Sequence, residues 1–209
     1  MATGVGRGTV TGTGTGAGRR RFDSGRVCLD LVATGTVTSG AGELLDGPER
    51  LADWLVAARL VPEGTALTAL DDSWVTRFRQ LRTGVDRLMT AELCGRGADA
   101  ALDRVNALAA GAPPGLRAVR GRGGTLVRAL NAEPDCGALL AAVARDAVEL
   151  LTDPAARAVL RRCEGEACRR LYLDTSRGRR RRWCSSEVCG NRERVARHRR
   201  RAAAAATGA

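Results

Sequence analysis

The sequence contains no lysine and a single histidine, so its 34 basic residues are all arginine. Aromatic residues are equally scarce, at 3% of the 209 residues. Hydrophobic residues make up 44% of the chain, which is enough to build a buried core. Because Leu, Val and Ala must supply that core, the composition favours packed helices over a β-sandwich or a barrel.

Long apolar runs are also missing. None approaches the roughly 18 residues that a membrane-spanning helix needs. Residues 1–18, which include the run TVTGTGTGAG, lack the apolar segment of a secretory signal. We therefore expect a cytoplasmic protein with no membrane partner, in which paired cysteines hold a metal ion. The cysteines number seven, and an odd number fits a disulfide framework poorly.

The positive charge is concentrated at the C-terminal end. Between Arg157 and Arg201 the sequence has 16 arginines and five acidic residues, whereas residues 1–156 have 18 of each. The whole net charge of +11 therefore lies in the last quarter of the chain. A neutral body with a basic end is typical of polyanion-binding proteins, although solvated basic tails without a partner have the same composition.

Apolar periodicity predicts a mainly helical N-terminal region. Residues 1–20 are too rich in Gly and Thr to bury anything and are expected to be disordered. The apolar run 27–32 fits either a strand or a short helix, and residues 116–130 fit a β-hairpin that turns near Gly123 and Gly124. Helix starts are predicted at Asp46, at Asp71 or Asp72, at Asp99, at Asp135 and at Asp153, the last helix leading directly into Cys163.

Four cysteines form two short-spaced pairs, Cys163 with Cys168 and Cys184 with Cys189. Two such pairs supply the four thiolates of a tetrahedral, structural zinc site, and the segment between them must form a hairpin. We place that hairpin at residues 171–183, and we expect Ser185 or Ser186 to cap a helix that begins at the second pair. The alternatives are an iron–sulfur cluster and four unrelated buried cysteines.

The remaining candidate ligands show no pairing. Cys28, Cys94 and Cys136 are expected to be packed core thiols. His198 lies within the basic C-terminal segment, where it is expected to face solvent or a phosphate group.

The finger sequence resembles a known family. The runs Arg181-Arg182-Trp183-Cys184-Ser185-Ser186 and Cys189-Gly190-Asn191-Arg192, preceded by the turn Asp174-Thr175-Ser176-Arg177, resemble the CGNR zinc finger. The runs Cys28-Leu29-Asp30-Leu31-Val32 and Pro48-Glu49-Arg50-Leu51 resemble the ABATE domain that accompanies this finger, except that Ala33 stands where an Asn is expected. The resemblance spans residues 22–201 and implies a bacterial transcription regulator, in some members linked to stress, that binds DNA.

Helical phase assigns roles to the basic residues after the second cysteine pair. Val188 and Val195 are expected to face the hairpin, which turns Arg192 inward as a brace for the metal site. Asn191 is expected to stabilise local structure, with contact to a base as the other option. The residues expected to contact nucleic acid are Arg179, Arg180, Arg181, Arg182, Arg194, Arg197 and Arg201.

We therefore expect a mainly α protein with a small β component. Its predicted parts are a disordered tail (1–20), a helical domain (21–157), a treble-clef-like four-cysteine zinc finger (158–201) and a second disordered tail (202–209). The predicted function is DNA-binding transcription regulation with one structural zinc ion per chain, with the helical domain as a sensor or as the site of homodimer formation. The alternatives are an RNA- or ribosome-associated finger protein, or an enzyme housed in the helical domain.

Overall fold

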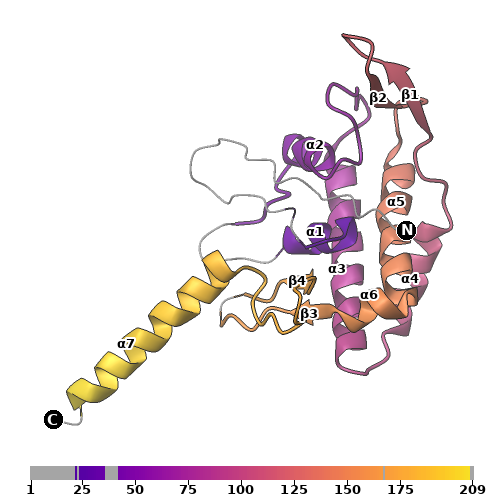
Figure 1. The fold of residues 1–209 in the computed structure, drawn as a ribbon. Coiled ribbons are helices and arrows are strands. Elements are labelled where there is room, and N and C mark those ends of the chain that lie inside the picture. The colour runs from indigo at the N-terminus through magenta and orange to yellow at the C-terminus, as the bar shows by residue number, and fades with distance from the viewer. Residues whose placement is uncertain (1–21, 23, 36–41, 167, 208–209) are drawn as a thin grey trace.

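The computed structural model describes residues 22, 24–35, 42–166 and 168–207, with side chains up to Ala203. These residues form a helical domain followed by a small C-terminal module (Figure 1), which confirms the mainly α fold class. The elements are α1 (Val27–Ala33), α2 (Pro48–Ala57), α3 (Asp72–Leu93), α4 (Asp99–Ala109), β1 (Leu116–Arg120), β2 (Leu126–Leu130), α5 (Cys136–Thr152), α6 (Pro154–Ala158), β3 (Leu160–Arg162), β4 (Leu171–Leu173), the π-helical turn η1 (Ser186–Gly190) and α7 (Asn191–Thr207). The tail expected over residues 1–20 lies outside the described residues. In the part of the chain that is described, no helix is long and apolar enough to cross a bilayer.

The core of the helical domain lies between α3, α4 and α5, with α1 and α2 packed against α3 (Figure 1). The apolar stripe of α3 is buried along its whole length, from Trp74 through Phe78 to Met89. Trp54 of α2 meets Phe78 edge to face, with 6.1 Å between the ring centroids. Such contacts bury large areas, which allows a few aromatic rings to supplement a core of Leu, Val and Ala.

Aspartate caps begin three of the helices as predicted. The Asp71 carboxylate accepts from the amides of Ser73 and Trp74, Asp135 from Ala138, and Asp153 from Ala155. The cap predicted at Asp46 is wrong. Gly47 takes the N-cap position of α2, with no side-chain hydrogen bond, and Pro48 follows as its first residue. Pro48 suits the first helical position, because its fixed φ matches the helix and it has no amide hydrogen that would need an acceptor there.

The apolar run 27–32, which fitted a strand or a helix, is helix α1. Residues Cys28 to Val32 are all buried. A segment that is buried on every side has no exposed polar face, so its sequence cannot distinguish the two-residue repeat of a strand from the 3.6-residue repeat of a helix. The Arg26 guanidinium, 2.8 Å from the carboxylate of Asp146, anchors the start of α1 on α5. The same carboxylate accepts from the Cys28 amide at 2.9 Å.

The hairpin predicted at residues 116–130 is confirmed as β1 and β2, which pair antiparallel from Leu116 with Leu130 to Arg120 with Leu126. Gly123 and Gly124 both have positive φ in its turn, at 83° and 78°. This backbone conformation strains any residue with a Cβ atom, which explains the paired glycines.

The C-terminal module joins the helical domain through strands β3 and β4. The helix predicted to run into Cys163 instead ends at Ala158, because residues 160–162 pair antiparallel with residues 171–173. Leu160 and Leu171 are fully buried in the same apolar core as the helices. The two parts of the chain therefore share one core and have no linker between them.

A buried ion pair reinforces this junction. Arg170, immediately before β4, lies 3.7 Å from the carboxylate of Asp30 in α1, and both side chains are less than a tenth exposed. The Arg170 guanidinium also donates to the Ser24 hydroxyl at 2.9 and 3.0 Å, and the Ser24 amide donates to Asp30. These hydrogen bonds satisfy charges that would otherwise be costly to bury.

The last helix extends further than the sequence suggested. α7 continues to Thr207, so the disordered tail predicted over residues 202–209 is wrong for residues 202–207. Residues 202–206 are all alanine, the residue with the highest intrinsic helix propensity, and they extend a helix that has already formed.

We predict that Arg170→Met lowers the free energy of unfolding by about 3–5 kcal/mol, because it leaves the Asp30 carboxylate buried without its cation. Urea denaturation followed by circular dichroism measures this change. Arg177→Met, at an exposed position in the same module, is the matched control and is expected to leave stability unchanged. Equal stability of the two variants would contradict a structural role for the Asp30–Arg170 pair.

Candidate metal centre

The first cysteine pair lies in the turn between β3 and β4. The Cys163 amide donates to the Arg170 carbonyl at 2.9 Å, which extends the strand pairing by one step, and the Cys168 amide closes the turn on the Gly165 carbonyl. The β-hairpin of the module therefore encloses the first pair. We had expected it between the two pairs, at residues 171–183, but the segment after β4 forms a loop with no strand of its own.

The second cysteine pair is positioned by η1. As predicted, Ser185 caps this turn, and its hydroxyl accepts from the Val188 amide at 3.2 Å. The Gly190 amide donates to the Ser185 carbonyl, five residues earlier, which makes the turn π-helical. This wide turn contains Cys189, and Cys184 lies two residues before its start.

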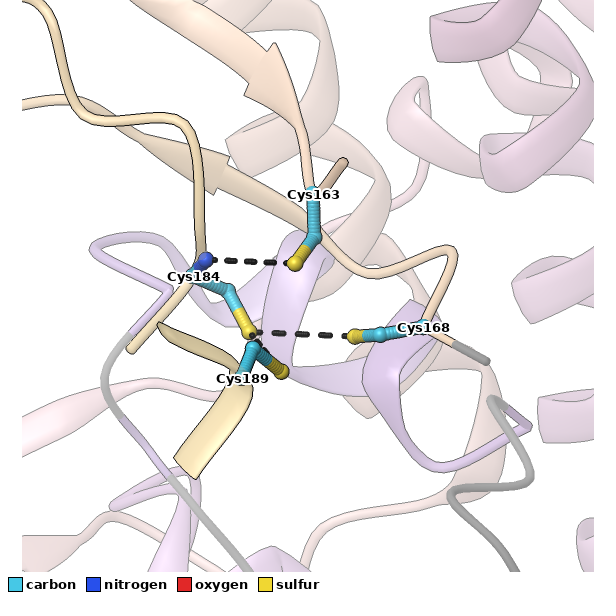
Figure 2. A group of neighbouring side chains, drawn as sticks. All are labelled: Cys163, Cys168, Cys184 and Cys189. Atoms are coloured by element: carbon cyan, nitrogen blue, oxygen red, sulfur yellow. Dashed lines mark hydrogen bonds between the residues drawn. The ribbon is translucent and has the colours of Figure 1, made fainter. Parts of the chain in front are cut away.

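All four sulfur atoms converge on one point (Figure 2), where they lie within 4.8 Å of one another. The Sγ–Sγ distance is 3.8 Å between Cys168 and Cys184 and 3.6 Å between Cys184 and Cys189. A zinc ion bound by four thiolates at about 2.3 Å separates its ligands by about 3.8 Å, so the geometry fits a single tetrahedral ion. A cluster of several irons and sulfides needs more room than these sulfurs leave between them.

The burial of the sulfurs also suits a bound cation. All four cysteines are at most 6% exposed. Thiols of Cys168 and Cys184 that donate to Cys163 hold its pKa far below the usual value, with further help from the Cys184 amide at 3.4 Å. The pKa of Cys184 is raised in turn by its hydrogen bonds with Cys163 and Cys168, and burial raises the pKa of Cys189 to about 12. Ionisation of all four buried cysteines is therefore favourable only with a divalent ion at their centre.

The loop after β4 is ordered by Asp174. Its carboxylate accepts from the hydroxyl and the amide of Ser176 and from the Arg181 amide, at 2.6, 3.0 and 2.8 Å. These hydrogen bonds to the ionised form lower the pKa of Asp174. The Arg181 guanidinium stacks over the Tyr172 ring at 4.5 Å, and the Tyr172 hydroxyl donates to the Arg181 carbonyl. Arg181 is half-buried and braces the loop.

Arg182 and Arg192, which lie on either side of the second cysteine pair, differ in what they contact. Arg182 forms a 2.5 Å ion pair with Glu164 of the first turn and lies over the Trp183 ring at 5.2 Å. Arg192 is exposed and lines a small hollow beside Cys168, Cys189 and Glu166. Of the residues predicted to contact nucleic acid, Arg181 is half-buried, and the structure leaves the others on the surface: Arg179, Arg180, Arg182, Arg194, Arg197 and Arg201.

The orientation of α7 differs from the prediction. Val188 and Val195, expected to face the hairpin, are 41% and 43% exposed. The two valines still share one face of the helix, but the hydrogen bond between Glu193 and the Glu166 amide turns that face toward solvent. The sequence analysis also missed Glu193, whose carboxylate accepts from the Glu166 amide at 2.9 Å and ties α7 to the first cysteine turn.

The other cysteines lie away from the centre. Cys28 and Cys136 are buried as expected, and burial raises the pKa of both, that of Cys136 to about 11. Cys94 is exposed at the end of α3, so its assignment to the core is wrong. His198 faces solvent, as predicted.

We predict that the purified protein carries one zinc ion per chain and that Cys184→Ser abolishes stoichiometric binding, since three thiolates cannot complete the tetrahedron. Elemental analysis by mass spectrometry measures the metal content. Cys94→Ser, at the exposed cysteine, is the control and is expected to retain full zinc. Retention of one zinc ion by Cys184→Ser would show that this cluster does not hold it.

Comparison with known families agrees with this geometry. The ABATE family, described as "putative stress-induced transcription regulator", matches residues 25–154, and the CGNR zinc finger matches residues 160–202. No curated protein matches the chain. Neither family description names an enzyme. Because the first match covers more than half of the sequence and the second covers all four clustered cysteines, this chain belongs to the ABATE family and carries a C-terminal CGNR zinc finger that binds one structural zinc ion.

Proposed function

We propose that this protein is a DNA-binding transcription regulator of the bacterial cytoplasm, in which the zinc finger presents α7 to duplex DNA. The observation that carries the proposal is the position of this helix, which leads away from the rest of the protein (Figure 1). Residues 191–203 contain six arginines and one glutamate, so the projecting element is also strongly basic. A basic helix that is anchored at one end only is accessible to a polyanion along most of its length.

The described side chains favour duplex DNA over RNA. The major groove of B-form DNA is about 12 Å wide and admits an α-helix, whereas that of A-form RNA is too narrow for side chains to read. Single-stranded RNA is bound by stacking its bases on exposed aromatic rings. In the finger, Tyr172 is buried and Trp183 is half-buried under Arg182. Neither ring forms an open stacking surface.

The helical domain is proposed to sense a signal or to mediate dimerisation. The family description, which names a stress-induced transcription regulator, supports a regulatory role for this domain. A homodimer would suit a palindromic target, since the symmetry of the protein then matches that of the site.

The direct test of the function is to recover the nucleic acid bound to the native protein at moderate salt and to sequence it. Enrichment of defined duplex DNA sites is expected. Mixed RNA would favour the ribosome-associated alternative, and the absence of any nucleic acid would contradict both.

We predict that Arg197→Ala weakens duplex DNA binding without changing the zinc content or the melting temperature, because this exposed side chain contributes only charge. Arg192→Ala, which removes a side chain that lines the hollow beside the thiolates, is expected to lower the melting temperature and speed zinc loss to a chelator. Fluorescence anisotropy, thermal denaturation and a colorimetric zinc assay measure the three quantities. The opposite pattern would reverse the roles of the two arginines.

We also predict a steep salt dependence of binding. If about six to ten arginines contact phosphates, affinity is expected to fall about 10³–10⁵-fold between about 50 and 200 mM salt, because each contact releases condensed counterions. A salt titration monitored by anisotropy gives the slope. A nearly flat titration would exclude phosphate contacts as the main source of affinity.

A further inference from the structure

Two contacts fix which side of α7 faces the protein. Glu193 accepts a hydrogen bond from the Glu166 amide at 2.9 Å, and Arg200 lies 3.6 Å from the Glu166 carboxylate. These residues are seven positions apart, close to two full helical turns, so they lie on one face of the helix. Ala196, between them on the same face, is half-buried. This face is turned toward the first cysteine turn.

The opposite face of α7 follows from the helical repeat of 3.6 residues per turn. It comprises Asn191, Arg194, Val195, His198, Arg201 and Ala202. All of these residues are exposed. Val195 is one of the few large apolar side chains that the structure leaves exposed, at 43%. Among the described residues, no hydrogen bond engages the side chain of Asn191.

We infer that this outer face reads base edges in the major groove of duplex DNA, with Asn191, Arg194 and Val195 as specificity-determining residues. The inference rests on the proposed function and goes beyond it, because it separates sequence reading from charge attraction. An Asn side chain pairs with the N6 and N7 atoms of adenine, an Arg side chain with O6 and N7 of guanine, and apolar side chains contact the thymine methyl group. The face combines all three chemistries.

The flanks of the outer face carry arginines on both sides. Arg199 lies on one flank and Arg197 on the other, each roughly a quarter turn or more from the centre of the face. A helix inserted in a groove has a phosphate backbone along each side, so these positions suit phosphate contacts. The arginines therefore divide into a group that faces the bases and a group that faces the two strands.

Charge selects DNA as the occupant of this face over a second copy of the helix. Val195 and Ala202 are seven residues apart, a spacing that also occurs in coiled coils. However, the neighbouring positions are Arg194, Arg199 and Arg201, which would bring like charges together in a pair of α7 helices. A polyanion neutralises the same residues.

The test uses the full chain with zinc bound and a duplex selected by it from random sequence. Arg194→Ala and Arg197→Ala, both exposed positions on α7, are compared by their affinity for the selected duplex and for a scrambled duplex of equal length. Arg194→Ala is expected to weaken binding to the selected duplex by about 5- to 150-fold and to leave the scrambled duplex nearly unaffected. Arg197→Ala is expected to weaken both by the same factor.

Equal losses on both duplexes for Arg194→Ala would overturn the assignment of this face to the bases while leaving DNA binding intact. Failure of the wild-type protein to bind any duplex would instead overturn the proposed function. A second measurement addresses Val195 directly. Replacing each thymine of the selected duplex by uracil removes only the methyl groups, and is expected to weaken the wild-type protein but not Val195→Ala. An unchanged wild-type affinity would exclude methyl contacts by this residue.

Discussion

Mutual repulsion between four buried thiolates, relieved only by a divalent ion between them, is the constraint on which the C-terminal module depends. The cysteines come from three places in the chain: the end of β3, the turn before β4, and the two ends of η1. Few large apolar side chains surround them, namely Tyr172 and Trp183. A module this small gains too little from burial to fold by itself, so the metal supplies the stability that holds the segments together.

Strand β4 transmits this local order to the rest of the protein. Its side chains alternate, so that Leu171 and Leu173 pack on the helical core while Tyr172 packs against the cysteines. The Arg170–Asp30 pair adds a polar contact to α1 at the same junction. A finger attached through a shared core has a defined orientation, and so has the base of α7. The metal site and strand β4 together therefore fix the orientation of the basic helix α7.

Much of this arrangement could be predicted from the sequence, because the relevant signals are local. Asp71, Asp135 and Asp153 are recognisable as caps, and the spacing of the two cysteine pairs identifies the metal ligands without any knowledge of the fold. The errors arise where a distant partner decides the outcome. Residues 160–162 form a strand because residues 171–173 pair with them. The face that α7 turns toward the protein is set by the contacts of Glu193 and Arg200 with Glu166, which lies 27 residues before Glu193.

The acidic residues of the finger decide which of its arginines can reach DNA. Glu164 pairs with Arg182, Glu166 pairs with Arg200, and Asp174 organises the loop that buries part of Arg181. These arginines contribute to the net charge of the module, but each already has a structural contact in the absence of DNA. The net charge of the module therefore overstates the number of arginines that are free to contact phosphates. The acidic residues also orient α7, since Glu193 holds the first turn of this helix against the metal site. The few carboxylates in this basic segment thus determine which arginines remain available to DNA and which way α7 is oriented.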